Sequence, residues 1–394
     1  MTRLKHAAAM VGALIAVTPW VSAVGADDVV TIGACQPITG RFAFAGAAIN
    51  AGLQDYIQYA NQKGLVRGKK LQYVYEDSGY DTDRAVACFK KIMAQHSPQI
   101  MYGESTGLGK AIAPELNSRY KVLYGSASFS SELANPQTHP YSFISGPTYS
   151  DMFGILLEYI AKQKGAGGAK PKVAYFYSDT EFGKDPIPYA KQRAAELGIQ
   201  VVAEIVTKVG AVDVTSEVLT LRKAQPDYVI FQGYVLAPIP EVIRAARDFG
   251  LKTKFMGTFW SMDKSIIDKL GPDAEGYMGV SPYSYWWEDA PGIRAMREYN
   301  AKAHPEEKYR PNSYIQGWFT GMVFVEAINR VLKAKKPITG ENLKDAIPTI
   351  KDWDVGGLTG KVTFVSNKAA VGRVYRANSQ KGNFEPVSDW MYLK

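Results

Sequence analysis

The chain has 394 residues, a size that suits two or three globular domains. It is 46% hydrophobic and 21% charged, which excludes a disordered or fibrous protein. The formal net charge of +8 is spread along the chain without long single-sign runs, so we expect no nucleic-acid partner.

The first residues have the pattern of a secretion signal. Basic residues precede an apolar stretch from Ala7 to Trp20, which is too short to span a bilayer. Small residues then lead to Ala26, after which we expect cleavage; cleavage after Ala23 is the alternative. We therefore assign residues 1–26 to a signal peptide and expect a soluble protein exported to the periplasm.

Short β-rich runs then alternate with stretches of helical periodicity. This alternation predicts βαβ units around parallel sheets. It begins at residue 29 and starts again at residue 173, so we expect two α/β lobes of similar build. The predicted strands are Val29–Ala34, Leu71–Glu76, Ile100–Tyr102, Val122–Tyr124, Val173–Tyr177, Val201–Val206, Tyr228–Gln232 and Phe255–Gly257, with a β-rich tail from Lys361. The predicted helices are Ala45–Asn61, Thr82–Gln95, Lys110–Ser118, Tyr189–Leu197, Thr215–Ala224, Glu241–Phe249 and Ile315–Leu332.

The chain has two cysteines, Cys35 at the end of the first predicted strand and Cys88 on a predicted helix. An oxidising compartment permits a disulfide between them. Their apolar neighbours suit buried free thiols equally well, so both states stay open.

Catalytic and metal-binding motifs are missing from the sequence, including HExxH, GxSxG and CxxC. Gly103–Ala111 resembles a phosphate loop only superficially, because Ala111 stands where a Mg²⁺-binding Ser or Thr is needed. A loop of this kind after a parallel strand presents backbone N–H groups to an anion, or simply forms a tight turn. We therefore predict a protein that is not an enzyme and needs no cofactor or metal.

The mature chain contains four segments in a characteristic order: IGACQPITGRFAFAGAAINAGLQDYIQYANQKGLVRGKKLQYVYEDSGYD, GIQVVAEIVTKVGAVDVTSEVLTLRKAQPDYVIFQGY, IRAARDFGLKTKFMGT and GPDAEGYMGVSPY. In order and spacing they resemble the type I periplasmic solute-binding proteins of ABC importers, in the Leu/Ile/Val-binding branch. The resemblance implies two Rossmann-like lobes with parallel central sheets, joined by a three-crossover hinge that closes on a ligand. The implied lobes are residues 27–145 with 283–355, and 146–282 with 356–394.

The resemblance also implies a set of ligand-binding positions. Two loops of the first lobe would hold a ligand carboxylate through backbone N–H and hydroxyl groups, and aromatic residues would wall the pocket; plain core packing is the alternative for each aromatic. The family's amino-acid binders carry an acidic residue opposite the ligand's ammonium group, and Phe259 stands at that position here. The implied positions are Phe44, Thr106, Gly107, Ala127, Ser128, Phe129, Tyr149, Phe182, Tyr234, Phe259 and Trp260.

We therefore predict a monomeric solute-binding protein that delivers a small carboxylate to the membrane permease of an ABC importer. An ammonium group without a partner would be costly beside Phe259, so the first expectation is an aromatic acid of the benzoate or cinnamate/coumarate type. Branched-chain amino acids and aliphatic or keto acids are the alternative ligands, and a sensory ligand-binding module is the alternative role. Glu104 and Asp179 are nearby acids that would restore amino-acid binding under a shifted alignment.

Overall fold

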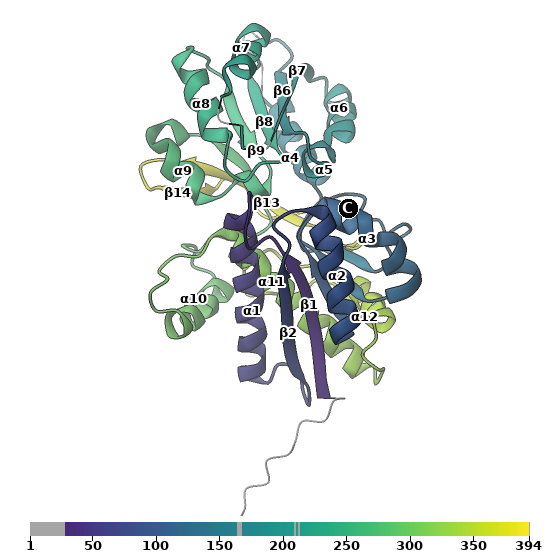
Figure 1. Cartoon of the computed structure of the whole chain (residues 1–394). Coiled ribbons are helices and arrows are strands. Elements are labelled where there is room, and N and C mark those ends of the chain that lie inside the picture. The colour runs from purple at the N-terminus through teal and green to yellow at the C-terminus, as the bar shows by residue number, and fades with distance from the viewer. Residues whose placement is uncertain (1–27, 164–167, 209, 212, 394) are drawn as a thin grey trace, which may run out of the picture.

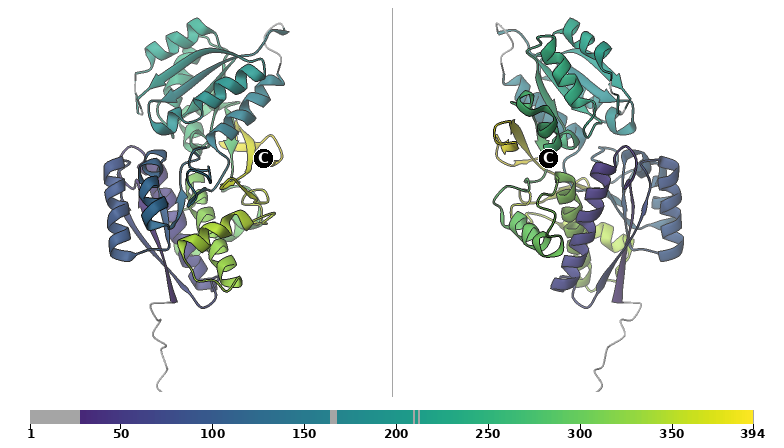
Figure 2. Two further views of the ribbon diagram at one scale, coloured as in Figure 1. Left: turned by 90° about the vertical axis from the view of Figure 1, so that its right-hand side faces the viewer. Right: turned by 60° about the vertical axis from the view of Figure 1, so that its left-hand side comes forward.

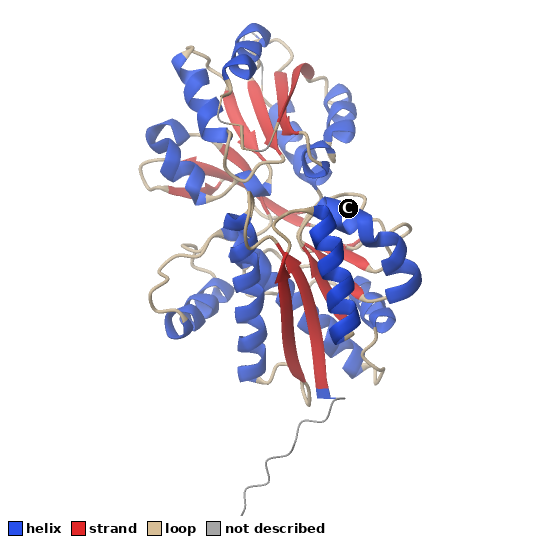
Figure 3. Cartoon of the chain, viewed as in Figure 1, coloured by secondary structure: helices blue, strands red, loops and turns tan. Residues whose placement is uncertain are grey.

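The computed structural model describes residues 28–163, 168–208, 210–211 and 213–393, so the predicted signal peptide lies outside the described residues. Two α/β parts are visible, each built on its own sheet with helices packed against it (Figures 1 and 3). We call the part that contains strand β1 (Val29–Gln36) the first lobe and the part that contains β6 (Lys172–Ser178) the second lobe. Figure 2 shows the lobes one above the other, joined at a narrow waist. Within the described ranges, no helix is both long and apolar enough to cross a membrane.

The first sheet has seven strands, and the pairs from β5 to β2 are parallel. Its order is β11 (Phe364–Val365), β12 (Lys368–Ala369), β5 (Ser142–Ile144), β4 (Leu123–Ser126), β3 (Ile100–Gly103), β1 and β2 (Lys70–Asp77). Strands β3 and β4 are buried at every residue, as expected for parallel strands covered on both faces.

The second sheet has eight strands and is also mostly parallel, with antiparallel strands at one side. Its order is β14 (Asn383–Pro386), β13 (Val371–Asn378), β10 (Met278–Ser281), β9 (Lys254–Gly257), β8 (Tyr228–Gln232), β6 and β7 (Gln200–Thr207), and β15 (Met391–Tyr392) pairs with β13. The predicted two-lobed α/β class is confirmed, with sheets that are mixed rather than purely parallel.

Helices flank both sheets (Figure 3). The first lobe carries α1 (Ala43–Lys63), α2 (Thr82–His96), α3 (Thr106–Glu115) with a π-helical turn at Leu116–Tyr120, α10 (Pro291–Ala303), α11 (Asn312–Lys333), α12 (Gly340–Ala346) and a 3₁₀ turn at Ile347–Thr349. The second lobe carries α4 (Tyr149–Ala161), α5 (Glu181–Lys184), α6 (Ile187–Glu196), α7 (Thr215–Ala224), α8 (Ile239–Asp248), α9 (Lys264–Leu270) and 3₁₀ turns at Phe259–Ser261 and Gly271–Ala274.

Helices α1 and α11 pack at very short range, because glycines meet at their contact. A Cβ atom at Gly317 would lie 2.1 Å from the Ile49 carbonyl oxygen, so the helices come this close only without a side chain there. The contact fixes α1, whose first turns carry Ala45 and Ile49 towards the site described below.

The chain passes between the lobes at three places in the described structure. The first two are residues 145–148, between β5 and α4, and residues 282–290, between β10 and α10. The third is Ala370, between β12 and β13. The predicted boundary at 355/356 is corrected to this position, because β11 and β12 hydrogen-bond to the first sheet rather than the second.

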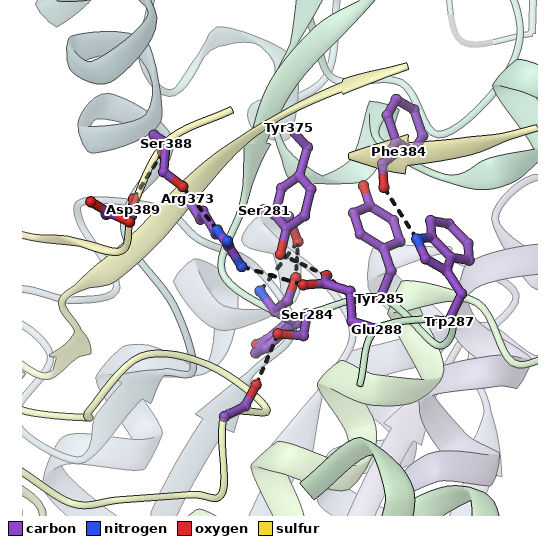
Figure 4. A network of polar contacts seen from close by, with 12 residues as sticks. Ser281, Ser284, Tyr285, Trp287, Glu288, Arg373, Tyr375, Phe384, Ser388 and Asp389 are labelled. Carbon is purple, nitrogen blue, oxygen red and sulfur yellow. Dashed lines mark hydrogen bonds and ion pairs between the residues drawn. The ribbon is translucent and has the colours of Figure 1, made fainter. Parts of the chain in front are cut away.

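A polar network fixes the second passage to the second sheet (Figure 4). The Glu288 carboxylate accepts a hydrogen bond from the Tyr375 hydroxyl at 2.9 Å and another from the backbone N–H of Tyr285 at 2.7 Å. It also pairs with the Arg373 guanidinium at 3.3 Å. The segment is also bonded to the first lobe, because Ser284 donates its backbone N–H to the Leu358 carbonyl and its hydroxyl to the Gly357 carbonyl, each at 2.8 Å.

Cys35 and Cys88 form a disulfide, with their Cα atoms 6.1 Å apart. This settles the alternative that the sequence leaves open. The bond ties α2 to β1, a central strand of the first sheet. The chain has no other cysteines, so the second lobe has no such cross-link.

Candidate ligand-binding site

A cavity lies where the two lobes meet. Its walls come from loops that follow the carboxyl ends of strands in both sheets, which is where open α/β sheets bind ligands. The first lobe contributes Pro37, Phe42, Ala45, Gly46, Ile49, Tyr80, Glu104, Ser105, Thr106, Ala127 and Ser128. The second lobe contributes Tyr149, Phe182, Val235 and Trp260.

Hydroxyl groups and a helix N-terminus gather at one end of the cavity. Ser105 caps α3, because its Oγ accepts a hydrogen bond from the backbone N–H of Leu108 at 3.1 Å. The hydroxyls of Thr106 and Ser128 lie 2.6 Å apart and bond to each other. The first N–H groups of any helix lack an intrahelical acceptor and carry partial positive charge. This end of the cavity therefore suits an anion such as a carboxylate.

Glu104 lies beside this anion-favouring end and is the one carboxyl group among the lining residues. Its side chain is buried, with 6% of the residue exposed, and Oε2 has no hydrogen-bond partner. Burial, with a smaller contribution from the negative charges of Asp77 and Asp81, raises the pKa of Glu104 to about 8. No Lys, Arg or His lines the cavity. Glu104 is therefore the one carboxyl or basic group among the lining residues, and burial disfavours its charged form.

Aromatic side chains of the second lobe close the opposite side of the cavity. The Trp260 indole N–H donates a hydrogen bond to the Tyr149 hydroxyl at 2.9 Å. The Tyr149 and Phe182 rings have their centres 5.0 Å apart, and Phe182 and Trp260 lie 6.4 Å apart. We call Tyr149, Phe182 and Trp260 the aromatic wall. The Tyr149 hydroxyl also interacts with Ser128 and the Phe129 backbone of the first lobe, so the polar atoms of the wall have partners and its rings contribute apolar surface to the cavity.

The two lobes touch beside the cavity. The Lys110 ammonium pairs with Glu181 of the second lobe at 3.0 Å. The Ser131 hydroxyl donates to Ser150 at 2.9 Å, and the Ser131 backbone N–H donates to Asp185 at 3.3 Å. The two lobes are therefore in direct polar contact at the side of the site.

Residues 29–383 match the periplasmic binding protein family. The chain belongs to this family. Family membership places it with binding components of transport rather than with enzymes, as predicted. Among the described residues, no cluster of His, Cys, Asp and Glu is arranged to hold a metal ion.

The chain is similar to other solute-binding proteins in sequence and in structure. It is 26% identical over 278 residues to the Leu/Ile/Val/Thr-binding protein of Salmonella typhimurium, covering 66% of this chain and 69% of the relative. A Thermus thermophilus branched-chain amino acid ABC transporter structure with bound valine superimposes with a TM-score of 0.84 at 27% identity, covering 92% and 96% of the two chains. A fatty acid ABC transporter substrate-binding protein from Thermomonospora curvata has a TM-score of 0.80 at 20% identity, covering 93% of each chain, and shows the fold alone.

The periplasmic binding protein brings part of the predicted site together. The positions on the cavity wall are Thr106, Ala127, Ser128, Tyr149, Phe182 and Trp260. Phe129 is fully buried behind them, and its ring packs 5.3 Å from Phe259 and 5.9 Å from Tyr149. Gly107 lies in the first turn of α3, off the cavity wall and beside the Thr82 side chain. These two residues support the site without lining it.

Three further predicted aromatic residues, Phe44, Tyr234 and Phe259, do not line the cavity. Phe44 is 49% exposed and borders a smaller hollow, together with Phe259. Helix α1 begins two residues earlier than predicted, and Phe42 lines the cavity instead of Phe44. Tyr234 is buried in the core of the second lobe.

Other lining residues were missed from the sequence. Tyr234 is held in the core because its hydroxyl bonds to the Thr207 hydroxyl at 2.7 Å, and the next residue, Val235, reaches the cavity. Ser105 has a readable signal, since a serine before a helix is a common N-cap. Phe42 and Tyr80 have no local signal, because only the packing of the strand-end loops brings their rings to within 4.2 Å.

Proposed function

We propose that the chain is the extracytoplasmic solute-binding protein of an ABC importer, and that it hands a small carboxylate to the membrane permease. The observation that carries this proposal is the cavity between the strand ends of the two lobes, with one hydroxyl-rich, anion-favouring end and, Glu104 apart, mostly apolar walls elsewhere. A small acid with an apolar body fits these features, because its carboxylate needs hydrogen-bond donors and its body needs apolar contacts. A periplasmic location and a monomeric state go with this proposal.

An aliphatic body is now preferred over an aromatic one. The relatives at 25–26% identity are named for Leu, Ile and Val, and the superimposed Thermus thermophilus structure has bound valine. The case for an aromatic acid also loses part of its support within the site. Phe129 and Phe259 pack against each other instead of facing the cavity, and the acid missing at position 259 has a counterpart in Glu104.

Aromatic acids stay the second candidate, because a specific observation favours them. Phe42, Tyr80 and the aromatic wall put five rings around the cavity. Such rings accept a flat ring through offset or edge-to-face contacts worth about 0.5–1.5 kcal/mol per pair beyond simple burial.

A thermal-shift screen followed by calorimetry tests the proposal. The set contains L-leucine, L-valine, 4-methylpentanoate, benzoate and 4-coumarate, with the methyl esters of the acids as controls. A ligand at a thousandfold excess over its Kd stabilises the folded protein by about 4 kcal/mol. Stabilisation by the acids and not by their esters supports the proposal; equal binding of acid and ester, or no binding by the whole set, contradicts it. Scattering with and without ligand should show an unchanged molecular mass.

A further inference from the structure

We propose that Glu104 binds the ammonium group of the ligand, so that the cavity selects α-amino acids over acids that lack the amino group. This inference rests on the proposed function, since it requires the ligand carboxylate to lie at the N-terminus of α3. The carboxylate that pairs with the ammonium group then lies in the first lobe, next to the groups that bind the ligand carboxylate.

The position of Glu104 is the first support. It directly precedes Ser105 and Thr106, and the residue lines the cavity beside the hydroxyl-rich end. In an α-amino acid the ammonium and carboxylate groups are attached to the same carbon atom. A protein that binds both groups therefore needs its acceptor and its anion site side by side, as they are here.

The unused hydrogen-bonding capacity of Glu104 is the second support. The residue is 6% exposed, and its Oε2 atom is buried without a partner. Buried polar atoms in native proteins are nearly always bonded, and leaving one unpaired is destabilising. An ammonium group carries N–H donors and a positive charge, which together match this oxygen.

The charges around Glu104 are the third support. The groups that face it are the carboxylates of Asp77 and Asp81, the Arg84 guanidinium, and the phenols of Tyr80 and Tyr124. None of the lining residues is basic. A simple carboxylate would bring another negative charge into this group, whereas an amino acid brings a positive charge with it.

Phe259 is then no obstacle to amino-acid binding. It borders the smaller hollow and packs against Phe129 and Tyr283, with ring centres 5.3 Å and 5.5 Å away. Asp263 lines the same hollow, and its carboxylate accepts the backbone N–H of Ser265 at 2.8 Å. Within the described site, Glu104 takes over the role that an acid at position 259 would have.

Proton linkage gives the proposal a distinct signature. Burial raises the pKa of Glu104 to about 8, so the empty site holds a proton at neutral pH. Binding an ammonium group favours the carboxylate and releases this proton. The affinity for an amino acid should therefore increase about tenfold from pH 6 to pH 7 and level off above about pH 8. If Glu104 instead kept its proton and donated it to a ligand carboxylate, affinity would fall above pH 8 and no proton would be released.

Isothermal titration calorimetry with matched ligand pairs tests the assignment. The pairs are L-leucine with 4-methylpentanoate, L-valine with 3-methylbutanoate, and L-phenylalanine with 3-phenylpropanoate. Titrations at pH 7 in buffers of different ionisation enthalpy count the protons released. The variants are Glu104→Gln, which keeps the shape and removes the charge, and Asp179→Asn as the matched control, because Asp179 is exposed and does not line the cavity.

The expected result is that the amino acid of at least one pair binds at least a hundredfold more tightly than its partner, with release of close to one proton. Glu104→Gln should remove both the preference and the proton release, and Asp179→Asn should change neither. Equal affinity within every binding pair, or no proton release by the unmodified protein, overturns the role of Glu104. The proton count in the unmodified protein decides the question even if Glu104→Gln does not fold.

The two proposals fail in different ways. If the deaminated acids bind and the amino acids do not, the assignment of Glu104 is wrong while the carboxylate-binding function stands. If neither the acids nor the amino acids bind, the proposed function itself is wrong.

Discussion

The two sides of the cavity differ in chemistry. The first lobe contributes Glu104, Ser105, Thr106 and Ser128, which can bond to a polar ligand group. The second lobe contributes the aromatic wall and Val235, whose surface towards the cavity is apolar. This difference indicates that the first lobe binds the polar end of the ligand and that the second lobe encloses its apolar body. We infer that a ligand first meets the first lobe and that closure of the second lobe then buries its apolar part.

The lobes also differ in covalent cross-links. The first lobe contains the disulfide, and the second contains no cysteine. A fixed polar surface and a covering wall that moves against it would explain this asymmetry. The following experiments are ordered from the largest expected effect to the smallest.

Removing the disulfide should destabilise the first lobe most. The bridge joins residues 53 apart, and closing such a loop in the unfolded chain corresponds to about 4 kcal/mol. The double variant Cys35→Ala/Cys88→Ala should lose stability of this order in chemical denaturation. Reductant should then have no further effect on it. An unchanged denaturation midpoint would show that the first lobe does not depend on its cross-link.

The free energy of unfolding of the ligand-free protein should fall as the pH rises, because of Glu104. The folded state keeps a proton up to a pKa of about 8, whereas the unfolded chain loses it near the ordinary value of 4.5. Stability is therefore lost between these values, by about 3 kcal/mol from pH 4.5 to pH 7. Glu104→Gln should be more stable than the unmodified protein at pH 7 and equal to it at pH 4.5, as measured by urea denaturation. A pH-independent difference between the two proteins would argue against a buried, titrating carboxyl group.

Trp260→Ala should weaken ligand binding by about 2 kcal/mol, or roughly thirtyfold, because it opens the aromatic wall and removes its hydrogen bond to Tyr149. Trp287→Ala is the matched control. Trp287 lies in the second passage between the lobes and does not line the cavity; it stacks on Tyr285 with ring centres 4.6 Å apart. The control should lower the free energy of unfolding and leave the Kd unchanged. Equal losses of affinity in both variants would mean that Trp260 acts through stability alone.

Thr106→Ala should weaken binding by about 1 kcal/mol, the value of one hydrogen bond. Thr207→Ala removes a hydroxyl of the same kind in the second lobe, where it bonds to Tyr234 at 2.7 Å. Calorimetry should show a weaker Kd for the first variant only. A weaker Kd for Thr207→Ala would instead indicate that Tyr234 contributes to ligand binding.

Glu181→Gln should have the smallest effect. It removes the exposed ion pair with Lys110 across the lobes, and such pairs contribute about 0–1 kcal/mol. Stopped-flow release of ligand should become up to about threefold faster, because the closed arrangement loses one contact. The control Glu115→Gln removes the pair with Lys90 within the first lobe and should leave the release rate unchanged.

Elements with a strong local pattern could be predicted from the sequence closely. The predicted strand Tyr228–Gln232 and helix Thr215–Ala224 agree with the structure to the residue. Helix α1 begins before its predicted start, because Phe42 precedes it without a capping side chain and leaves no signal. Helix α3 also begins earlier than predicted, because glycines in its first turns, such as Gly107, hide its periodicity.

The site could be predicted as a set of loops but not side chain by side chain. The carboxyl ends of parallel strands meet at one edge, so the loops around Thr106 and Ser128 could be expected together. Whether Tyr234 or Val235 faces the cavity depends on how the loop after β8 packs on Thr207, which is distant in sequence. The role of Glu104 depends on a burial that no local pattern encodes.

The third passage between the lobes consists of the single residue Ala370. Its backbone N–H bonds to the Thr363 carbonyl on the first lobe at 3.3 Å, and its carbonyl accepts the N–H of Leu393 at 2.9 Å. A link this short cannot lengthen, so the ends of β12 and β13 stay together however the rest of the molecule moves. We therefore expect the lobes to open by rotating about a hinge beside Ala370. A small rotation at this hinge gives a large displacement at the far rim of the cavity.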